Sequence, residues 1–137
     1  MPSERYSFTV TIDPLEPHVA KNLGVSQLPV LQADVMQRWT RKRYREVWAA
    51  RTQLAIMCQT KAPAEPLKSA EITAIRFCTG TPPDWPNVVY SFKPIIDSLV
   101  GWIIEDDNPS VLLSEKYYSV RVRTKAEQRL EISLVGV

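Results

Sequence analysis

Acidic residues stand at both ends of one stretch of the chain, DWPNVVYSFKPIIDSLVGWIIEDD, which runs from Asp84 to Asp107. Its middle is apolar with helix-like spacing and carries a single lysine, Lys93. Carboxylates are hard oxygen ligands that suit Mg²⁺, which takes one or two of them and completes its shell with water and phosphate oxygens. A nearby lysine adds positive charge where a phosphodiester bond is hydrolysed. The stretch therefore predicts a divalent-metal site that acts on nucleic acid, provided that the fold brings its acidic ends together within one chain or across a dimer.

The same residues also have a purely structural interpretation. Asp84 is suited to capping a turn, and the run Asp106-Asp107-Asn108-Pro109 is typical of turns. Lys93 and Asp97 are four residues apart and share one helical face, where they form a surface pair worth roughly a few tenths of a kcal/mol. Spacing alone leaves both interpretations open.

A second candidate surface is basic. Between positions 38 and 51 the chain reads RWTRKRYREVWAAR, in which six basic residues are accompanied by one glutamate. Four of the basic residues follow the i, i+3, i+4, i+7 spacing of one helical face: Arg38, Arg41, Lys42 and Arg45. Such a stripe is either a solvated helix surface or, because like charges repel one another without an anionic partner, a contact for nucleic-acid phosphates.

The composition limits the other functions that the chain can have. A length of 137 residues fits one domain, residues 1–137. No run of about 18 apolar residues occurs and the N-terminus lacks the apolar core of a signal peptide, so we expect no membrane span and a cytoplasmic location. The two cysteines, Cys58 and Cys78, are isolated, which argues against structural zinc. The single histidine, His18, lies between prolines and is more typical of a loop than of a catalytic base.

Hydrophobic periodicity predicts the first elements that would position these residues. Alternation over 6–13 predicts a half-buried strand, and a proline-rich loop follows over 14–32. A basic helix is expected over about 34–59, with Asp34 as its N-cap. Residues 67–79 are apolar on both faces in places, which predicts a central strand.

The second half of the chain carries the acidic motif 84–107 on a predicted helix over 88–100. Pro94 predicts a kink in this helix, and Gly101 is the expected stop. Alternation over about 112–135 predicts a C-terminal hairpin. The predicted fold class is therefore α+β, with two main helices on a mixed or antiparallel sheet.

The acidic motif resembles the signature of RusA-type Holliday junction resolvases, small endonucleases of prophages and bacteriophages. Their pattern is approximately Asp-x-Asp-Asn, then Lys, then Asp-x-Leu, then Asp-Asp. Here Lys93 is followed by Asp97-Ser98-Leu99 at the family's spacing, and Asp106-Asp107 closes the pattern. The first strand, proline-rich loop, basic helix and last strand are also similar. The resemblance thus covers most of the chain, with its specific residues in 84–107.

Two departures from the family pattern bear on activity. When Asn87 is aligned with the family's asparagine, the first aspartate is Asp84, but Pro86 occupies the place of the second. Lys93 then follows at a longer spacing than the most familiar one. When Lys93 is aligned instead, Asn87 and Val89 replace both aspartates. We prefer the first alignment because it keeps Asp-x-x-Asn.

The resemblance implies a RusA-like fold and a homodimer that nicks opposing strands of a four-way DNA junction. It implies Mg²⁺ as the cofactor, with Mn²⁺ as a substitute. The implied metal ligands are Asp84, Asp106 and Asp107. Lys93 would stabilise the transition state, and Asn87 would orient the cluster.

The resemblance also implies that Asp97 supports Lys93 or the helix and does not bind the metal. Branched DNA would meet the basic stripe through its phosphates, which position DNA without reading its sequence, at Arg38, Arg41, Lys42 and Arg45. Two other interpretations stay open. Pro86 motivates a RusA-like DNA-binding protein with weakened or lost cleavage, and the basic helix also suits a phage interaction protein that meets an acidic partner.

Overall fold

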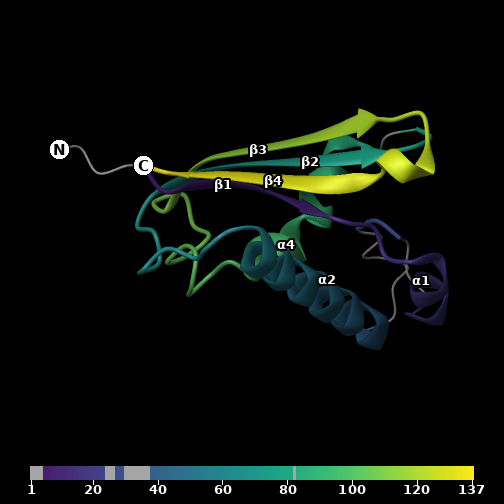
Figure 1. The fold of residues 1–137 in the computed structure, drawn as a ribbon, viewed down its shortest axis with the longest axis horizontal. Coiled ribbons are helices and arrows are strands. Elements are labelled where there is room, and N and C mark those ends of the chain that lie inside the picture. The colour runs from purple at the N-terminus through teal and green to yellow at the C-terminus, as the bar shows by residue number, and fades with distance from the viewer. Residues whose placement is uncertain (1–4, 24–26, 30–37, 82) are drawn as a thin grey trace.

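The computed structural model describes residues 5–23, 27–29, 38–81 and 83–137. Figure 1 shows a sheet with helices α2 and α4 side by side on one side of it. The elements in chain order are β1 (Ser7–Ile12), α1 (Pro17–Leu23), α2 (Arg38–Gln59), β2 (Ala70–Cys78), α3 (Trp85–Ser91), α4 (Lys93–Asp97), β3 (Leu112–Arg121), the 3₁₀ turn η1 (Lys125–Glu127) and β4 (Arg129–Gly136). The predicted α+β class is confirmed, and of the two sheet types that the prediction left open, mixed and antiparallel, the sheet is mixed.

The sheet has four strands in the order β1-β4-β2-β3. β4 runs antiparallel to both of its neighbours, β1 and β2, whereas β2 and β3 run parallel. The predicted hairpin over about 112–135 is therefore wrong, because β2 lies between β3 and β4. Alternation in the sequence reports that each strand has one buried face, but it does not report which strand is its neighbour.

The strands bury the side chains that face the helices. In β1 these are Phe8, Val10 and Ile12, all of which belong to the hydrophobic core. In β2, Ile72 and Ala74 are almost completely buried. β2 is hydrogen-bonded to a strand on each side, which confirms its predicted central position.

The basic helix predicted over about 34–59 corresponds to α2. Its expected N-cap, Asp34, lies outside the described residues. Three large side chains attach the helix to the core and are buried almost completely: Tyr44, Trp48 and Ile56. Within the described ranges, no helix combines the length and the apolarity that crossing a bilayer requires.

The proline-rich segment over 14–32 was expected to be a loop, but it contains helix α1. A proline is tolerated at the first helical position because the N–H that it lacks has no partner there. The segment is closed by a double contact, in which Leu15 N–H donates to Gln27 O (2.8 Å) and Gln27 Nε2 donates to Leu15 O (2.9 Å). Residues 24–26 and 30–32 of this prediction lie outside the described residues.

The helix predicted over 88–100 is two short helices, α3 and α4, which meet at Phe92. Pro94 explains the break: it has no N–H to continue the helix and instead lies in the first turn of α4. Gly101 adopts φ 92°, a left-handed conformation that glycine tolerates best. The predicted apolar stripe is buried, at Val88, Phe92, Ile95, Ile96 and Leu99.

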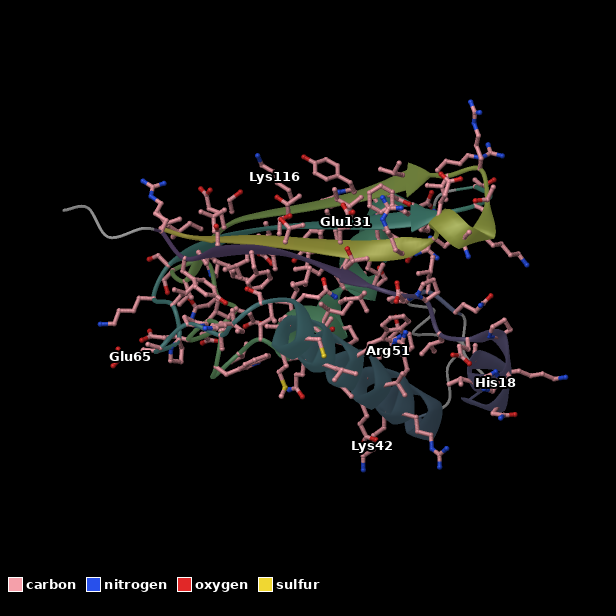
Figure 2. The ribbon with its side chains drawn as sticks, viewed as in Figure 1. His18, Lys42, Arg51, Glu65, Lys116 and Glu131 are labelled. Atoms are coloured by element: carbon pink, nitrogen blue, oxygen red, sulfur yellow. The ribbon has the colours of Figure 1, made fainter. Side chains whose placement is uncertain are left out.

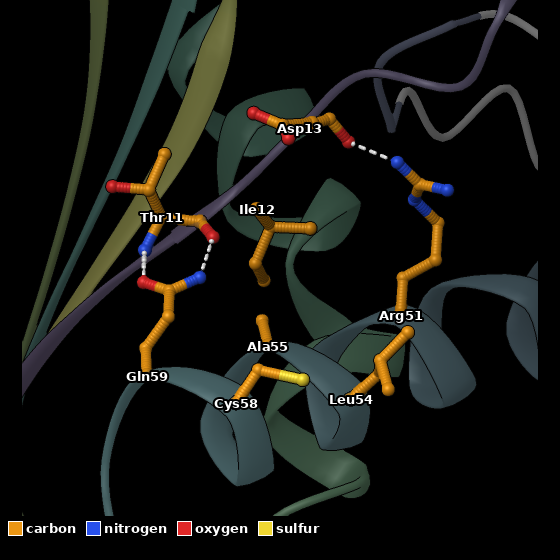
Figure 3. A pocket seen from close by; sticks show the side chains of 8 residues that line it. All are labelled: Thr11, Ile12, Asp13, Arg51, Leu54, Ala55, Cys58 and Gln59. Atoms are coloured by element: carbon orange, nitrogen blue, oxygen red, sulfur yellow. Dashed lines mark hydrogen bonds between the residues drawn. The ribbon is translucent and has the colours of Figure 1, made fainter.

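The outer edge of β1 is closed by side chains of α2, as Figure 3 shows. Thr11 N–H donates to Gln59 Oε1 (2.8 Å), and Gln59 Nε2 donates to Thr11 O (2.6 Å), so the amide takes the place of a neighbouring strand. Arg51 donates to the carbonyl oxygens of Asp13 (2.8 Å) and Pro14 (3.0 Å) just beyond the strand. A small pocket of about 220 Å³ lies between these contacts.

Candidate functional site

The acidic motif 84–107 lies in the crossover that connects β2 to β3. Parallel neighbours require a connection that leaves one end of the sheet and returns at the other. Asp84 follows the C-terminal end of β2 at the start of α3, whereas Asp106 and Asp107 precede the N-terminal end of β3. β2 has nine residues and is about 26 Å long. Within one chain, Asp84 therefore lies toward the opposite end of the sheet from the other two carboxylates.

Lys93 is the centre of the one ionic cluster that the motif forms among the described residues. Its Nζ lies 3.0 Å from Asp97 Oδ1 and 2.9 Å from Asp107 Oδ2. The predicted pairing of Lys93 with Asp97 is confirmed, and the loop before β3 adds the second carboxylate. The side chains of Lys93 and Asp97 are about half exposed, so the cluster is open to solvent.

The charges of the cluster perturb each other. The hydrogen bond from Lys93 lowers the pKa of the Asp107 carboxyl below its usual value, against a smaller opposing effect of burial. Hydrogen bonds to Asp107 and then to Asp97 raise the pKa of the Lys93 ammonium. Both groups are thus held in their charged forms. Because the pair is exposed, its contribution to the free energy of unfolding is at most about 1 kcal/mol.

Asp106 shapes the loop that presents Asp107. Its Oδ1 accepts the backbone N–H of Asp107 (2.8 Å), and its Oδ2 accepts Asn108 Nδ2 (2.9 Å). Asn108 Oδ1 in turn accepts the N–H of Ser110 (3.0 Å). This is the turn chemistry that the sequence also suggested, and it fixes Asp107 beside Lys93.

Asp84 occupies the N-cap position of α3, but its side chain makes no capping hydrogen bond. Asn87 lies in the first turn of the same helix, and both side chains are exposed. Pro86 lies in the first turn as well, where its missing N–H has no helical acceptor. The turn therefore tolerates the proline that replaces the expected second aspartate.

The donor set suits an ion that keeps part of its water shell. In the described part of the chain, no three aspartate, glutamate, histidine or cysteine side chains converge as a metal cage. Mg²⁺ does not need such a cage, because one or two carboxylates and the phosphates of a substrate can complete its shell. Asp106 and Asp107 could contribute one or two such carboxylates, but Asp106 accepts hydrogen bonds from the Asp107 N–H and from Asn108, and Asp107 accepts one from Lys93. A bound ion would have to share these oxygens.

The basic helix lies next to the Lys93 cluster. A groove of about 270 Å³ is lined by Arg45, Glu46 and Ala49 of α2 and by Pro94, Asp97 and Ser98 of α4. Arg45 and Lys42 are exposed, and Figure 2 shows Lys42 directed away from the sheet. The side chains of Arg38 and Arg41 lie outside the described residues. Arg45 and Asp97 line the same groove because α2 packs on α4, a tertiary contact that local patterns in the sequence do not encode.

The motif residues thus fall into two groups. One group, Lys93, Asp97, Asp106 and Asp107, gathers where the crossover returns to the sheet. The other, Asp84 and Asn87, lies where the crossover begins. Comparisons of the chain with protein-family models, with curated proteins and with solved structures found no match.

Proposed function

We propose that the chain is a metal-dependent, structure-selective endonuclease of the RusA type that cuts four-way DNA junctions. One observation carries the proposal: Lys93 Nζ lies 2.9 Å from Asp107 Oδ2, although the two residues are 14 positions apart, one in α4 and the other in the loop before β3. These are the lysine and the final aspartate of the pattern that the sequence resembles. Their meeting on an exposed surface beside the basic helix supports a site that binds a phosphate.

Phosphodiester hydrolysis needs a group that neutralises charge on the phosphate and a nucleophile that is available at neutral pH. A Mg²⁺ ion held by Asp106 and Asp107 would supply both, by neutralising phosphate charge and lowering the pKa of a bound water. Asp107 is suited to this role because Lys93 keeps it ionised. A phosphate bound at the cluster would be a new anionic partner for the Lys93 ammonium. The ammonium would then lie beside the negative charge that develops in the transition state and would stabilise it.

The basic helix supplies the proposed binding surface for DNA. Arg45 lines the same groove as Asp97, so a strand whose phosphates follow α2 would arrive at the Lys93 cluster. Lys42, and by the helical spacing Arg38 and Arg41, would contact further phosphates. Affinity for DNA should then fall steeply as the salt concentration rises. Each phosphate contact should contribute about −0.9 to the slope of log K, the association constant, plotted against the logarithm of the salt concentration.

A DNA-binding protein without cleavage is the second candidate. It is favoured by Pro86, which takes the place of a carboxylate, and by the separation of Asp84 from Asp107 along the sheet. In this alternative, junction binding would persist and the Lys93 cluster would contact phosphate without hydrolysing it.

A cleavage assay separates the two candidates. A labelled synthetic four-way junction is incubated with the wild-type chain and Mg²⁺ or Mn²⁺, alongside Asp107→Asn and a matched control, Asp13→Asn. Asp13 is exposed at the far end of β1 and outside the cluster, so its variant controls for the loss of one charge. We expect cleavage by the wild type, a loss of at least about 100-fold in Asp107→Asn, and no change in Asp13→Asn.

Binding of the junction, measured in the same samples, decides which candidate each result supports. Tight junction binding with no cleavage of junctions, flaps or duplexes would overturn the nuclease and favour the second candidate. No binding even at low salt would overturn both. Equal activity of Asp107→Asn and the wild type would refute the assigned site.

A further inference from the structure

In the described part of the chain, the helices leave one face of the sheet uncovered. α2 and α4 lie on the other side (Figure 1), and the buried side chains of the strands point toward them. The buried ring of Tyr117 in β3 belongs to this covered face, since its centroid lies 5.7 Å from that of Phe92. The side chains that alternate with the buried ones therefore form an open face, which in most sheets is polar.

Part of the open face is aromatic and apolar. The parallel register of β2 and β3 sets Ile75 beside Tyr118 and Phe77 beside Val120, and these four residues form an aromatic patch. Tyr118 is 50% exposed and Val120 is 39% exposed. Phe77 and Tyr118 lie diagonally on neighbouring strands, so their Cα atoms are about 8 Å apart. Apolar side chains gathered on an open face mark a binding surface.

Arg129 of β4 adds a flat cationic surface to the aromatic patch. Its guanidinium carbon lies 4.0 Å from the centroid of the Phe77 ring. Its Nε donates to Glu131 Oε1 (3.2 Å) and its Nη1 donates to the backbone oxygen of Glu127 (2.7 Å), so the orientation of the guanidinium plane is fixed. Phe77 covers one face of this plane, yet the side chain of Arg129 is still 33% exposed. Nucleobases stack on guanidinium planes and on aromatic rings alike.

Cations border the aromatic patch along β3. Lys116 lies two residues before Tyr118 on the same face, and Figure 2 shows it pointing away from α2. Past the patch, three more basic residues follow and are exposed: Arg121, Arg123 and Lys125. Within the described residues, none of these four cations forms an ion pair. They are therefore available to an anionic ligand.

The acidic residues of this region are engaged or lie elsewhere. Glu131 accepts the hydrogen bond from Arg129, and the Glu127 carboxylate caps the turn η1. Glu115 belongs to the covered face of β3, and Glu71 lies near the other end of β2. The aromatic patch is thus bordered by net positive charge, and this combination is what binds single-stranded nucleic acid.

We propose that the aromatic patch binds a segment of single-stranded DNA, with bases stacked on Tyr118 and on the outer face of the Arg129 guanidinium. Phosphates on either side contact Lys116, Arg121 and Arg123. The distance from Lys116 to Arg121 along β3 is about 17 Å, so the cations lie at both ends of the stacking surface. Because every base has a π face, we expect binding to tolerate changes of sequence.

The chemistry of the patch favours an unpaired strand over other ligands. The bases of a duplex are stacked on one another and cannot reach a flat platform, whereas those of a single strand can. A protein partner would have to supply several acidic groups around an apolar centre, but DNA carries a phosphate at every nucleotide. The choice of DNA over RNA rests on the proposed function. The patch itself lies across the sheet from α2 and α4, and it is therefore a second binding surface.

Fluorescence anisotropy with a labelled oligothymidylate of about 12 nucleotides tests the stacking, in the absence of metal. Tyr118→Ala should raise the dissociation constant at least ~5-fold, the lower end of the effect of losing one stacked base. Tyr118→Phe keeps the ring and should bind like the wild type. Tyr90→Ala is the matched control, because Tyr90 is a similarly exposed tyrosine (56%) that lies on α3, and it should bind like the wild type.

The salt dependence of the same binding tests the phosphate contacts. Lys116→Gln should make the slope of log K against the logarithm of the salt concentration less steep by about 0.7, the value for one phosphate contact with a single strand. Lys21→Gln, the same change at an exposed lysine of α1, is the matched control and should leave the slope unchanged. Circular dichroism of each variant shows that weaker binding is not a lost fold. An oligomer that contains 5-bromouracil should cross-link to Tyr118 under ultraviolet light.

Three results would overturn the proposal in different ways. A wild-type chain that does not bind the oligomer at low salt would exclude single-stranded DNA and leave the open face to a protein partner. Equal binding by Tyr118→Ala and Tyr90→Ala would show that the oligomer binds elsewhere, as on the basic helix. Tighter binding of a ribonucleotide oligomer of the same length would overturn the choice of DNA. Because neither metal nor cleavage enters these measurements, failure here is distinguishable from failure of the nuclease.

Discussion

The contact between Gln59 and Thr11 should stabilise the fold by closing the edge of β1. Gln59→Ala removes two hydrogen bonds, of 2.8 and 2.6 Å, to the backbone of Thr11. Each is worth about 0.5–1.5 kcal/mol net, and water replaces part of that at an exposed edge, so we expect a loss of about 1–2 kcal/mol. For a chain of 137 residues, the entropy of unfolding is such that each 1 kcal/mol lost from the free energy of unfolding lowers Tm by about 3.5 °C. Tm should therefore fall by about 3–7 °C.

Urea unfolding, thermal melting and amide exchange measure this effect. Gln53→Ala is the matched control: Gln53 is exposed on the same helix, and its side chain makes no hydrogen bond within the described part of the chain. Since alanine favours a helix, this control should be neutral or slightly stabilising. In Gln59→Ala, exchange of the Thr11 amide should also accelerate. Equal stability of the two variants, with unchanged exchange at Thr11, would refute the proposed role of the contact.

Three other changes give distinct expectations. Leu99→Ala opens a cavity at a fully buried position and should cost about 2–5 kcal/mol in urea unfolding, whereas Leu113→Ala, at a side chain 52% exposed, should cost far less. Asp107→Asn should cost at most about 1 kcal/mol at about pH 7. Because Lys93 lowers the pKa of Asp107 from 3.8, this contribution is fully present above that value and is lost as pH falls through the lower folded pKa, so the wild type and the variant should become equally stable below it. Pro86→Asp should introduce the second carboxylate of the RusA pattern with a stability change below about 1 kcal/mol, and on the proposed function the junction assay should show at least ~10-fold faster cleavage.

Local patterns in the sequence predicted the elements well, because burial imposes its period on each strand and helix. The alternation of β1 and the apolar stripe of α3 and α4 are cases in which one buried face determines the residue types. Pro94 also predicted the break in the crossover helix, since a missing N–H acts locally.

The order of the strands was not predictable in the same way. β3 and β4 follow each other in the chain and both alternate, yet β2 lies between them. Strand pairing depends on contacts between distant residues, which local periodicity does not encode. The site shows the same contrast: the pair of Lys93 with Asp97 follows from helical spacing, whereas the contact of Lys93 with Asp107 depends on where the crossover returns to the sheet.

The RusA pattern has an aspartate where this chain has Pro86, and the fold does not decide between the two residues. Pro86 is exposed in the first turn of α3, a position at which a proline and an aspartate are both compatible with the helix. Nothing in the packing around it therefore requires the proline. The parallel crossover, in contrast, determines that Asp84 starts at one end of the sheet and Asp107 is reached at the other.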